Sequence, residues 1–281
     1  MNDFFDLNCF LLDPKLPKEA SKDHVRMWLE YKAGGGVDDP DSSDEARNFY
    51  KTIWKGFLEK SGLSLRPEAN SFSENPDQYV QGDWMCSVWW TLKHALQEAY
   101  GENENGDEWW QKPDIEDSFD DYDATEDTFA GILKHFDEFS EVFEDKTVQE
   151  FIRAAYTSAN LIIVPDGFNT ARSNRGTEDY WDLTLKKYYQ QDKKSLYYTD
   201  RNTHKQYEVA APFRKLLKKN QEQGDLLCLS PWIDEQGNPI LLPDSPKENK
   251  ANWRSAMAEM TSRIKCRCEL MAQYIAQLQN E

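Results

Sequence analysis

The sequence lacks the patterns that identify several classes of protein. No apolar run approaches the ~20 residues that a membrane-spanning helix needs, so we expect no membrane contact. The first twenty residues carry no basic residue before their apolar stretch, which makes them a poor signal peptide. The sequence therefore predicts a cytoplasmic protein.

Cysteine and histidine are too few and too scattered to predict a metal or redox site. The five cysteines form no CxxC pair, and Cys266 and Cys268 stand two apart in a predicted helix, so they point to different faces. The four histidines form no HExxH motif. Reduced, mostly buried thiols are the favoured interpretation. We expect no metal site, and the sequence identifies no cofactor.

The chain is long, rich in aromatic residues and rich in acidic residues. Its 281 residues suffice for one large domain with a sizeable core. Aromatic residues make up 13% of the sequence, which excludes wholesale disorder despite a net charge of −18. The sequence predicts a single domain over residues 1–281 with an acidic, flexible insertion around residues 102–127.

That insertion, the acidic strip (residues 102–127), contains twelve acidic residues and one basic residue, Lys112. Three interpretations stay open: a flexible solvated loop, a divalent-cation site around DSFDDYD, and a surface that faces a protein partner. The solvated loop is favoured, because no glycine falls where a calcium loop needs its turn.

Apolar residues at helical spacing predict several helices. Residues 87–101 have a serine at the start and a glycine at the end, as a capped helix does. Residues 125–143 and 250–280 carry apolar stripes, and Arg267 interrupts the second of these. A packed core explains the stripes better than a cofactor site or a coiled-coil partner.

Strand signals are few. The segment NLIIVP predicts a short strand at 160–165, and DLLCLSPWIDEQGNPILLP predicts a hairpin at about 225–242, because turn residues separate two apolar runs. The expected fold class is α+β, mainly α-helical with a small β element.

A polar loop after the predicted strand carries the candidate ligand-binding residues. Residues 169–176 (NTARSNRG) supply two guanidiniums, Arg172 and Arg175, and two amides, Asn169 and Asn174, which together can grip a phosphate or carboxylate. We expect both arginines to be partly exposed at the rim of a pocket. The alternative, which the residues alone favour, is that both pair with internal carboxylates.

A basic segment, residues 183–219, follows this loop. From Arg172 to Lys219 there are twelve Lys or Arg residues against six Asp or Glu, and tyrosines are interleaved with them. Basic residues track a phosphate backbone and tyrosines stack on unpaired bases, so the segment is a weak signature of nucleic-acid binding. The alternative, at least as well supported, is a solvated face that neutralises the acidic strip.

Taken in order, several segments resemble an uncharacterised bacterial family, a domain of unknown function. The segments DPDSS and RNFYKTIW resemble the family's DPD segment with its following Arg, aromatic and Trp residues. The segment GDWMCS resembles a later Ser-Asp segment, with Gly82 in place of serine. The segments NTARSNRG and DLTLKKYY resemble the most distinctive block, an Asn-x-Ala-Arg loop that leads into Asp-Leu-Thr-Leu.

The resemblance covers nearly the whole chain from about Asp38 onward, and the predicted hairpin and C-terminal helix match it in order. The chain departs from it by a shorter loop before Asn169 and by Ser173 in place of a glycine. The resemblance implies that the loop from Asn169 to Arg175 belongs to a shared core, but it brings no known activity.

Two functions are consistent with these patterns. The first is recognition of a phosphate-bearing ligand, a nucleotide or nucleic acid, through the 169–176 loop and the basic segment. If this protein is an enzyme, Asp39, Asp41 or Asp83 is the candidate base or metal ligand, although no local motif brings them together.

The second function is that of a non-enzymatic interaction or inhibitor protein, for example one with a role in defence or counter-defence. Such a protein would use the acidic strip and the tryptophans within it, Trp109 and Trp110.

Overall fold

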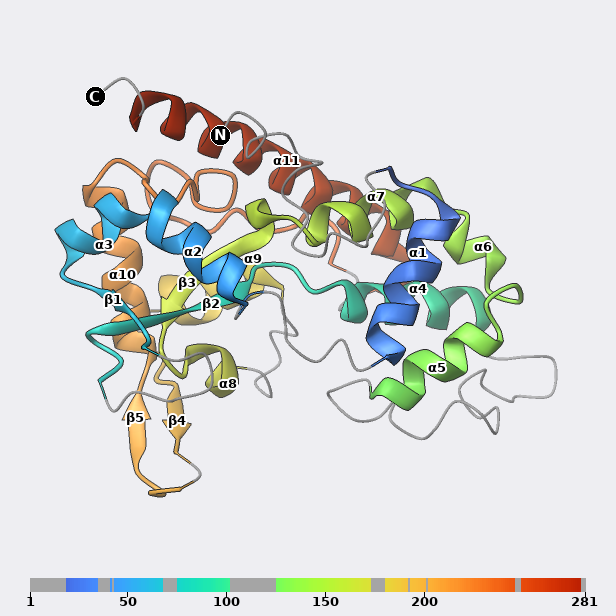
Figure 1. Cartoon of the computed structure of the whole chain (residues 1–281), viewed down its shortest axis with the longest axis horizontal. Coiled ribbons are helices and arrows are strands. Elements are labelled where there is room, and N and C mark those ends of the chain that lie inside the picture. The colour runs from blue at the N-terminus through green and yellow to red at the C-terminus, as the bar shows by residue number, and fades with distance from the viewer. Residues whose placement is uncertain are drawn as a thin grey trace.

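The computed structural model describes residues 19–34, 41, 43–67, 75–101, 125–172, 180–191, 193–200, 202–245 and 249–278. Figure 1 shows two lobes side by side, with the long helix α11 (Trp253–Leu278) lying across both. No helix within the described residues combines the length and apolarity needed to cross a bilayer.

One lobe, here called the helical lobe, contains only helices among its described elements. It contains α1 (Lys22–Ala33), α4 (Val88–Tyr100), α5 (Glu126–Lys134), α6 (Ser140–Phe143) and α7 (Lys146–Ala155). The predicted helix at 87–101 is confirmed as α4. The predicted helix at 125–143 is divided, because the chain turns at residues 135–139 between α5 and α6.

The other lobe, the sheet lobe, holds both sheets and the remaining helices. Its helices are α2 (Asp44–Ile53), α3 (Lys55–Ser61), α8 (Phe168–Arg172), α9 (Trp181–Leu185) and α10 (Ala210–Glu222), with a π-helical turn η5 (Lys186–Gln190) after α9 and a 3-10 turn η4 (Ser158–Asn160) before the central strand. A further 3-10 turn, η6 (Lys250–Asn252), leads into α11. The mainly helical α+β fold class is therefore confirmed.

The three-stranded sheet has the order β1-β2-β3. Strand β1 (Ser64–Leu65) is parallel to β2 (Tyr79–Trp84), and β2 is antiparallel to β3 (Leu161–Pro165) with Asp83 opposite Ile162. Every residue of β3 is buried, as its unbroken apolar run predicts, and the predicted strand at 160–165 is confirmed. Strand β2 has a polar centre, Gln81-Gly82-Asp83, and its sequence gives no strand signal.

The second sheet is a hairpin of two short strands, β4 (Tyr197–Thr199) and β5 (Gln206–Glu208), which projects from the sheet lobe in Figure 1. It is not the predicted hairpin. Within residues 225–242 the structure has one isolated bridge, Ile233 to Pro239, around a tight turn.

The predicted strand before that turn does not form, because its amides have other partners. Asp225 accepts hydrogen bonds from the amides of Leu229 (2.7 Å) and Ser230 (2.8 Å), and Asn220 accepts one from Leu227 (2.8 Å). Pro239 has no amide hydrogen to donate to a ladder. The reversal of the chain was predicted correctly, but the two strands were not.

Helix α11 buries the apolar stripe that its sequence predicts. Met257, Met260 and Ile264 are each at most 1% exposed, and the helix packs on α7, α4 and η4. Buried side chains of both lobes belong to one connected apolar core. Residues 102–124 lie outside the described residues, so the single domain with an acidic insertion stays a prediction.

We predict that Met260→Ala lowers the free energy of unfolding by ~2–5 kcal/mol, because it leaves a cavity in this core. Urea denaturation followed by circular dichroism measures the change. Leu278→Ala, at the 42% exposed end of the same helix, is the control and should cost less than about 0.5 kcal/mol. Equal losses in the two variants would contradict the packing of α11.

Candidate functional site

The four predicted ligand-binding residues are not presented together by the described structure. Asn169 is half-buried and Arg172 is 1% exposed, and both lie in helix α8 rather than in a loop. Asn174 and Arg175 lie outside the described residues. The expectation that Arg172 is partly exposed at the rim of a pocket is therefore wrong.

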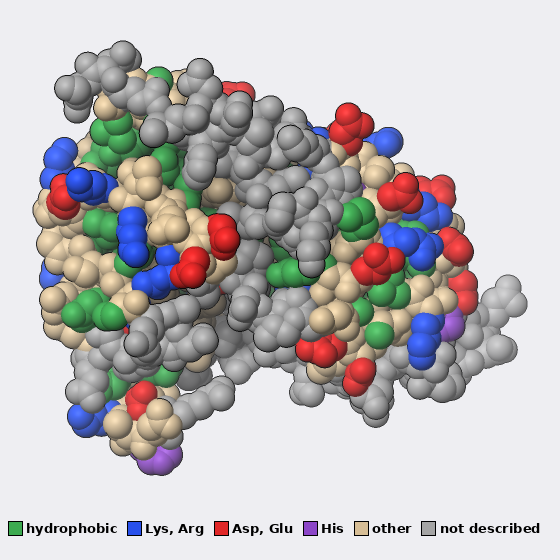
Figure 2. All heavy atoms as spheres, viewed as in Figure 1, with side chains coloured by type: hydrophobic (Ala, Val, Ile, Leu, Met, Phe, Trp, Pro, Cys, Tyr) green, Lys and Arg blue, Asp and Glu red, His purple; other side chains and the backbone are tan. Residues whose placement is uncertain are grey.

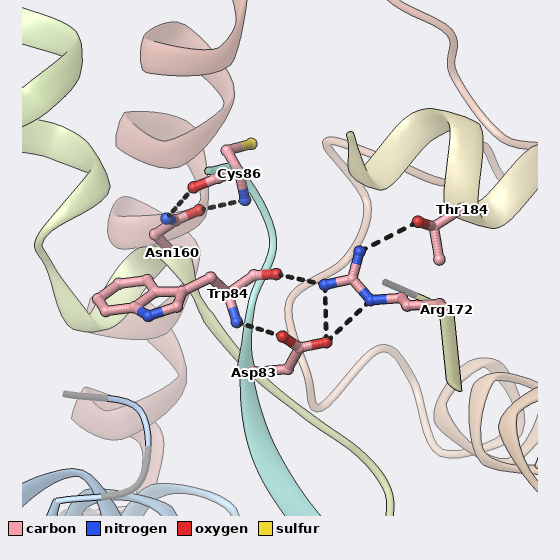
Figure 3. A network of polar contacts seen from close by, with 6 residues as sticks. All are labelled: Asp83, Trp84, Cys86, Asn160, Arg172 and Thr184. Atoms are coloured by element: carbon pink, nitrogen blue, oxygen red, sulfur yellow. Dashed lines mark hydrogen bonds and ion pairs between the residues drawn. The ribbon is translucent and has the colours of Figure 1, made fainter. Parts of the chain in front are cut away.

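Arg172 is buried because it forms an ion pair with Asp83 of β2, as Figure 3 shows. Its Nη2 and Nε atoms donate to Asp83 Oδ2 at 2.9 and 3.2 Å. Nη2 also donates to the carbonyl oxygen of Trp84 (3.3 Å), and Nη1 donates to Thr184 Oγ1 of α9 (3.4 Å). The guanidinium thus connects β2, α8 and α9.

The sequence around Asp83 explains how it reaches Arg172. Successive residues of a strand point to opposite faces, so Gly82 and Asp83 face opposite ways. On one face, a Cβ atom at Gly82 would overlap Tyr50 Oη of α2 and the backbone oxygen of Asp41. Glycine therefore lets α2 approach the strand, while Asp83 points at Arg172 on the other face. Asp83 Oδ1 accepts from the amide of Trp84 (2.8 Å), so both carboxylate oxygens are occupied.

A second arginine–aspartate pair involves the neighbouring residue on the same face of β2. Arg66 Nη1 donates to Gln81 Oε1 (2.9 Å) and to Asp166 Oδ1 (3.0 Å), and Asp166 has no exposed surface. Gln81 and Asp83 are two residues apart and so share a face. These two guanidiniums bind internal carboxylates, which is the alternative that the sequence favoured for Arg172.

The candidate catalytic carboxylates have structural contacts instead. Asp83 binds Arg172, and Asp41 is buried beside Tyr50, whose hydroxyl donates to the Asp41 backbone oxygen (2.9 Å). The cap of α2 is Ser43, whose Oγ accepts from the amide of Ala46 (3.1 Å). Asp39 lies outside the described residues. Among the described residues, no three His, Cys, Asp or Glu side chains are grouped closely enough to hold a metal ion.

One central residue, Arg267, was recognised in the sequence only as an interruption of an apolar stripe. The Arg267 guanidinium is fully buried and donates to the carbonyl oxygens of Ala159 (2.6 Å), Leu161 and Leu227 (3.0 Å). Burial lowers its pKa to about 10, so it remains charged at neutral pH. An arginine at a seam position of an amphipathic helix was the available signal.

Two surface cavities lie away from Arg172. One, of about 400 Å³, is lined in part by Asp225, Asp234 and Glu235, and its charge has the wrong sign for a phosphate. The other, of about 340 Å³, lies between α7 and α11. Neither is lined by Asn169 or Arg172.

The basic segment does form an exposed surface, the basic face, which comprises Lys193, Lys194, Arg214, Lys215 and Lys218. Arg214 of α10 donates to the carbonyl oxygens of Lys194 (2.8 Å) and Tyr188 (3.3 Å), so α10 and the residues after η5 lie together. Lys218 lies about one turn after Arg214 and Lys215 on α10; Lys215 and Lys218 are exposed and Arg214 is half-buried.

Most cations of the basic face are not neutralised by nearby acids. In the described part of the chain, no carboxylate pairs with Lys193, Lys194 or Lys218, whereas Lys215 contacts Asp77 at 3.4 Å. Glu208 accepts from the amides of Ala210 (3.1 Å) and Ala211 (2.8 Å) at the start of α10.

Asp200, which follows β4, is also occupied. It accepts from the amides of Thr203 (2.6 Å) and Asn202 (3.1 Å), and these hydrogen bonds lower its pKa. Figure 2 shows basic and acidic side chains mixed over the described atoms of both lobes in that view. The positive charge of the basic face is therefore a local feature and not a field over a whole lobe.

Comparisons with known proteins add no identity to this geometry. No protein-family model matches the chain, and neither a curated protein nor a solved structure is found to be similar to it. The resemblance to a family of unknown function therefore stays a prediction that rests on the quoted segments. The acidic strip up to Ala124, with Trp109 and Trp110, lies outside the described residues, so its role as a partner surface also stays a prediction.

We predict that Arg172→Ala lowers the free energy of unfolding by about 3–5 kcal/mol in the absence of any ligand, because it leaves Asp83 buried without its cation. Denaturant titration measures the loss. The double variant Asp83→Leu, Arg172→Met is the matched control and should recover most of it, since no buried charge remains. If Arg172→Ala leaves the free energy of unfolding unchanged, this pair does not hold β2 against α8.

Another buried acid, Asp182 of α9, allows a pH test. Its Oδ2 accepts from the amide of Leu242 (2.9 Å), but Oδ1 is buried without a hydrogen-bond partner among the described residues. Burial raises the pKa of Asp182. A carboxyl group whose pKa is higher in the folded than in the unfolded state stabilises the fold below its unfolded pKa, and this stabilisation is lost as the pH rises through the folded pKa.

We therefore predict that Asp182→Asn gains stability relative to the wild type as the pH rises from 4 to 7, because asparagine keeps an acceptor for Leu242 and never ionises. Unfolding free energies of both proteins at several pH values give this difference. A difference that is constant with pH would contradict the argument.

Proposed function

We propose that the protein recognises a phosphate-bearing ligand, a nucleotide or nucleic acid, through the basic segment rather than through Arg172. The observation that carries the proposal is the state of the charges on the basic face. Three exposed lysines, Lys193, Lys194 and Lys218, have no carboxylate partner among the described residues, while the neighbouring Glu208 and Asp200 are bound to backbone amides. Such cations are available to phosphate oxygens.

The net charge of −18 does not prevent such binding. At physiological ionic strength the Debye length is about 8 Å, so charges on distant surfaces are largely screened. A phosphate at the basic face interacts mainly with the side chains within that distance. The global charge opposes long-range attraction and makes binding strongly dependent on salt.

The 169–176 loop can still contribute to this ligand, since α8 packs against β4 of the projecting hairpin. Asn169, half-buried in α8, therefore lies on the same side of the sheet lobe as the strand that follows Lys193 and Lys194. In this proposal Asn169 adds a contact at one end of the basic face, and Arg172 holds α8 in place. Asn174 and Arg175 remain predicted ligand residues that lie outside the described residues.

We predict that replacing Lys193, Lys194 and Lys218 by Gln weakens binding to a fluorescein-labelled 12-nucleotide DNA strand by about 10–100-fold at 50 mM salt. Loss of three phosphate contacts should also reduce the slope of log K against log salt by about 2. Fluorescence anisotropy at several salt concentrations gives both quantities.

The matched control replaces three other exposed lysines by Gln: Lys134, Lys146 and Lys265, which lie on α5, α7 and α11. This variant has the same net charge as the first, so it separates local contacts from overall charge. The proposal fails if the wild type binds neither DNA, RNA nor nucleotides at low salt, or if both triple variants lose the same affinity.

A further inference from the structure

The projecting hairpin of β4 and β5 carries an aromatic side chain in an unusual setting. Tyr197 is 50% exposed, while Tyr180, Tyr188 and Tyr189 nearby in sequence are all at most 7% exposed. Of the large hydrophobic side chains that are strongly exposed in the described residues, Tyr197 is the aromatic one. An exposed ring on a projecting element is available for contact with a ligand.

The two faces of this hairpin differ. Tyr198 and Tyr207 are direct cross-strand neighbours, both partly buried, and α8 packs against β4. Strand alternation places Tyr197 and Thr199 on the opposite face from Tyr198, and both are exposed. Glu208, opposite Tyr197, directs its carboxylate to the amides at the start of α10. Within the described residues the face around Tyr197 is therefore open, and Glu208 on that face is already bound.

The chain runs directly from the basic face into the strand that carries Tyr197. Lys194 precedes Tyr197 by three residues, and Arg214 binds the Lys194 carbonyl oxygen, which joins the hairpin to the cations along α10. A ring beside a row of cations is the combination by which proteins hold an unpaired strand, with bases stacked on rings and phosphates bound by cations. In a duplex the bases are paired and stacked on one another, so they are not free to stack on a tyrosine.

We propose that the phosphate-bearing ligand is single-stranded nucleic acid and that Tyr197 stacks on one of its bases. This inference rests on the proposed function, and it adds the ligand class and the residue that selects it. A partner protein that adds a strand to the hairpin is less favoured, because strands of three residues offer few backbone hydrogen bonds.

The test compares four labelled probes of equal length at one salt concentration: a 12-nucleotide oligo(dT), the corresponding oligo(U), a 12-nucleotide abasic strand with the same phosphates, and a 12-base-pair duplex. We expect the wild type to bind oligo(dT) about 10–100-fold more tightly than the abasic strand, since one stacked base contributes that much. This comparison needs no variant.

Three single variants then assign the effect to the ring. Tyr197→Ala should remove the preference for oligo(dT) over the abasic strand without changing the salt slope, whereas Tyr197→Phe should keep it. Thr199→Ala, on the same face of the same strand, is the matched control and should behave as the wild type. Melting temperatures verify that each variant is folded.

The outcomes separate the two proposals. If the wild type binds none of the four probes, both the proposed function and this inference are overturned. If it binds oligo(dT), the abasic strand and the duplex equally, or if Tyr197→Ala keeps the preference, only the stacking inference is overturned. If a folded Tyr197→Phe loses as much as Tyr197→Ala, the ring is not the recognised feature and stacking is likewise rejected.

Discussion

The buried guanidinium of Arg267 is the contact on which the arrangement of the whole molecule depends. It binds carbonyl oxygens from three places in the chain: η4, the start of β3 and the turn that follows α10. Within the described residues it forms no ion pair with a carboxylate, although the charge of Asp225 acts on it, and the ring centroid of Trp54 lies 5.6 Å from its Cζ atom. Apolar contacts alone would let α11 slide by a turn, whereas Arg267 meets its acceptors in only one register. One polar residue thus specifies how an apolar helix docks.

Arg172 is buried by a different means. Arg267 is compensated by neutral dipoles, whereas Arg172 is compensated by a full negative charge on Asp83. Both solutions avoid an unpaired charge in a low-dielectric interior, which would cost several kcal/mol. Because Arg66 and Arg172 both bind internal carboxylates, the polar face of β2 offers little to a ligand. The available cations are instead on the outside, along α10 and before β4.

The parts of the fold that were predictable from the sequence are those in which neighbouring residues carry the signal. Strand β3 is an unbroken apolar run, and α4 and α11 have apolar residues at helical spacing. Strand β2 was missed because Gln81, Gly82 and Asp83 contact partners distant in sequence, namely Arg66, Tyr50 and Arg172. The prediction of a hairpin at 225–242 was wrong because Asp225 and Asn220 bind amides of this segment, and no local pattern reveals that these side chains compete with strand pairing.

The candidate site, like the fold, was predictable from the sequence only in part. Pairing of Arg172 with an internal carboxylate was the alternative that the residues alone favoured. Which of 51 acidic residues would be its partner could not be inferred, since Asp83 is 89 residues away. Exposure of the basic segment followed from its composition, but the exposure of Tyr197 beside buried tyrosines depends on which face of a short hairpin packs on α8.

The large sequence separation between Arg267 and two of its acceptors has a consequence for folding during synthesis. Its acceptors at Ala159 and Leu161 precede it by 108 and 106 residues, so they leave the ribosome long before the side chain that satisfies them. Until then those carbonyl oxygens must stay hydrated, and the apolar surfaces around β3 cannot close over them without a penalty. The sheet lobe therefore cannot be completed co-translationally in segments; its final closure awaits the last helix of the described chain.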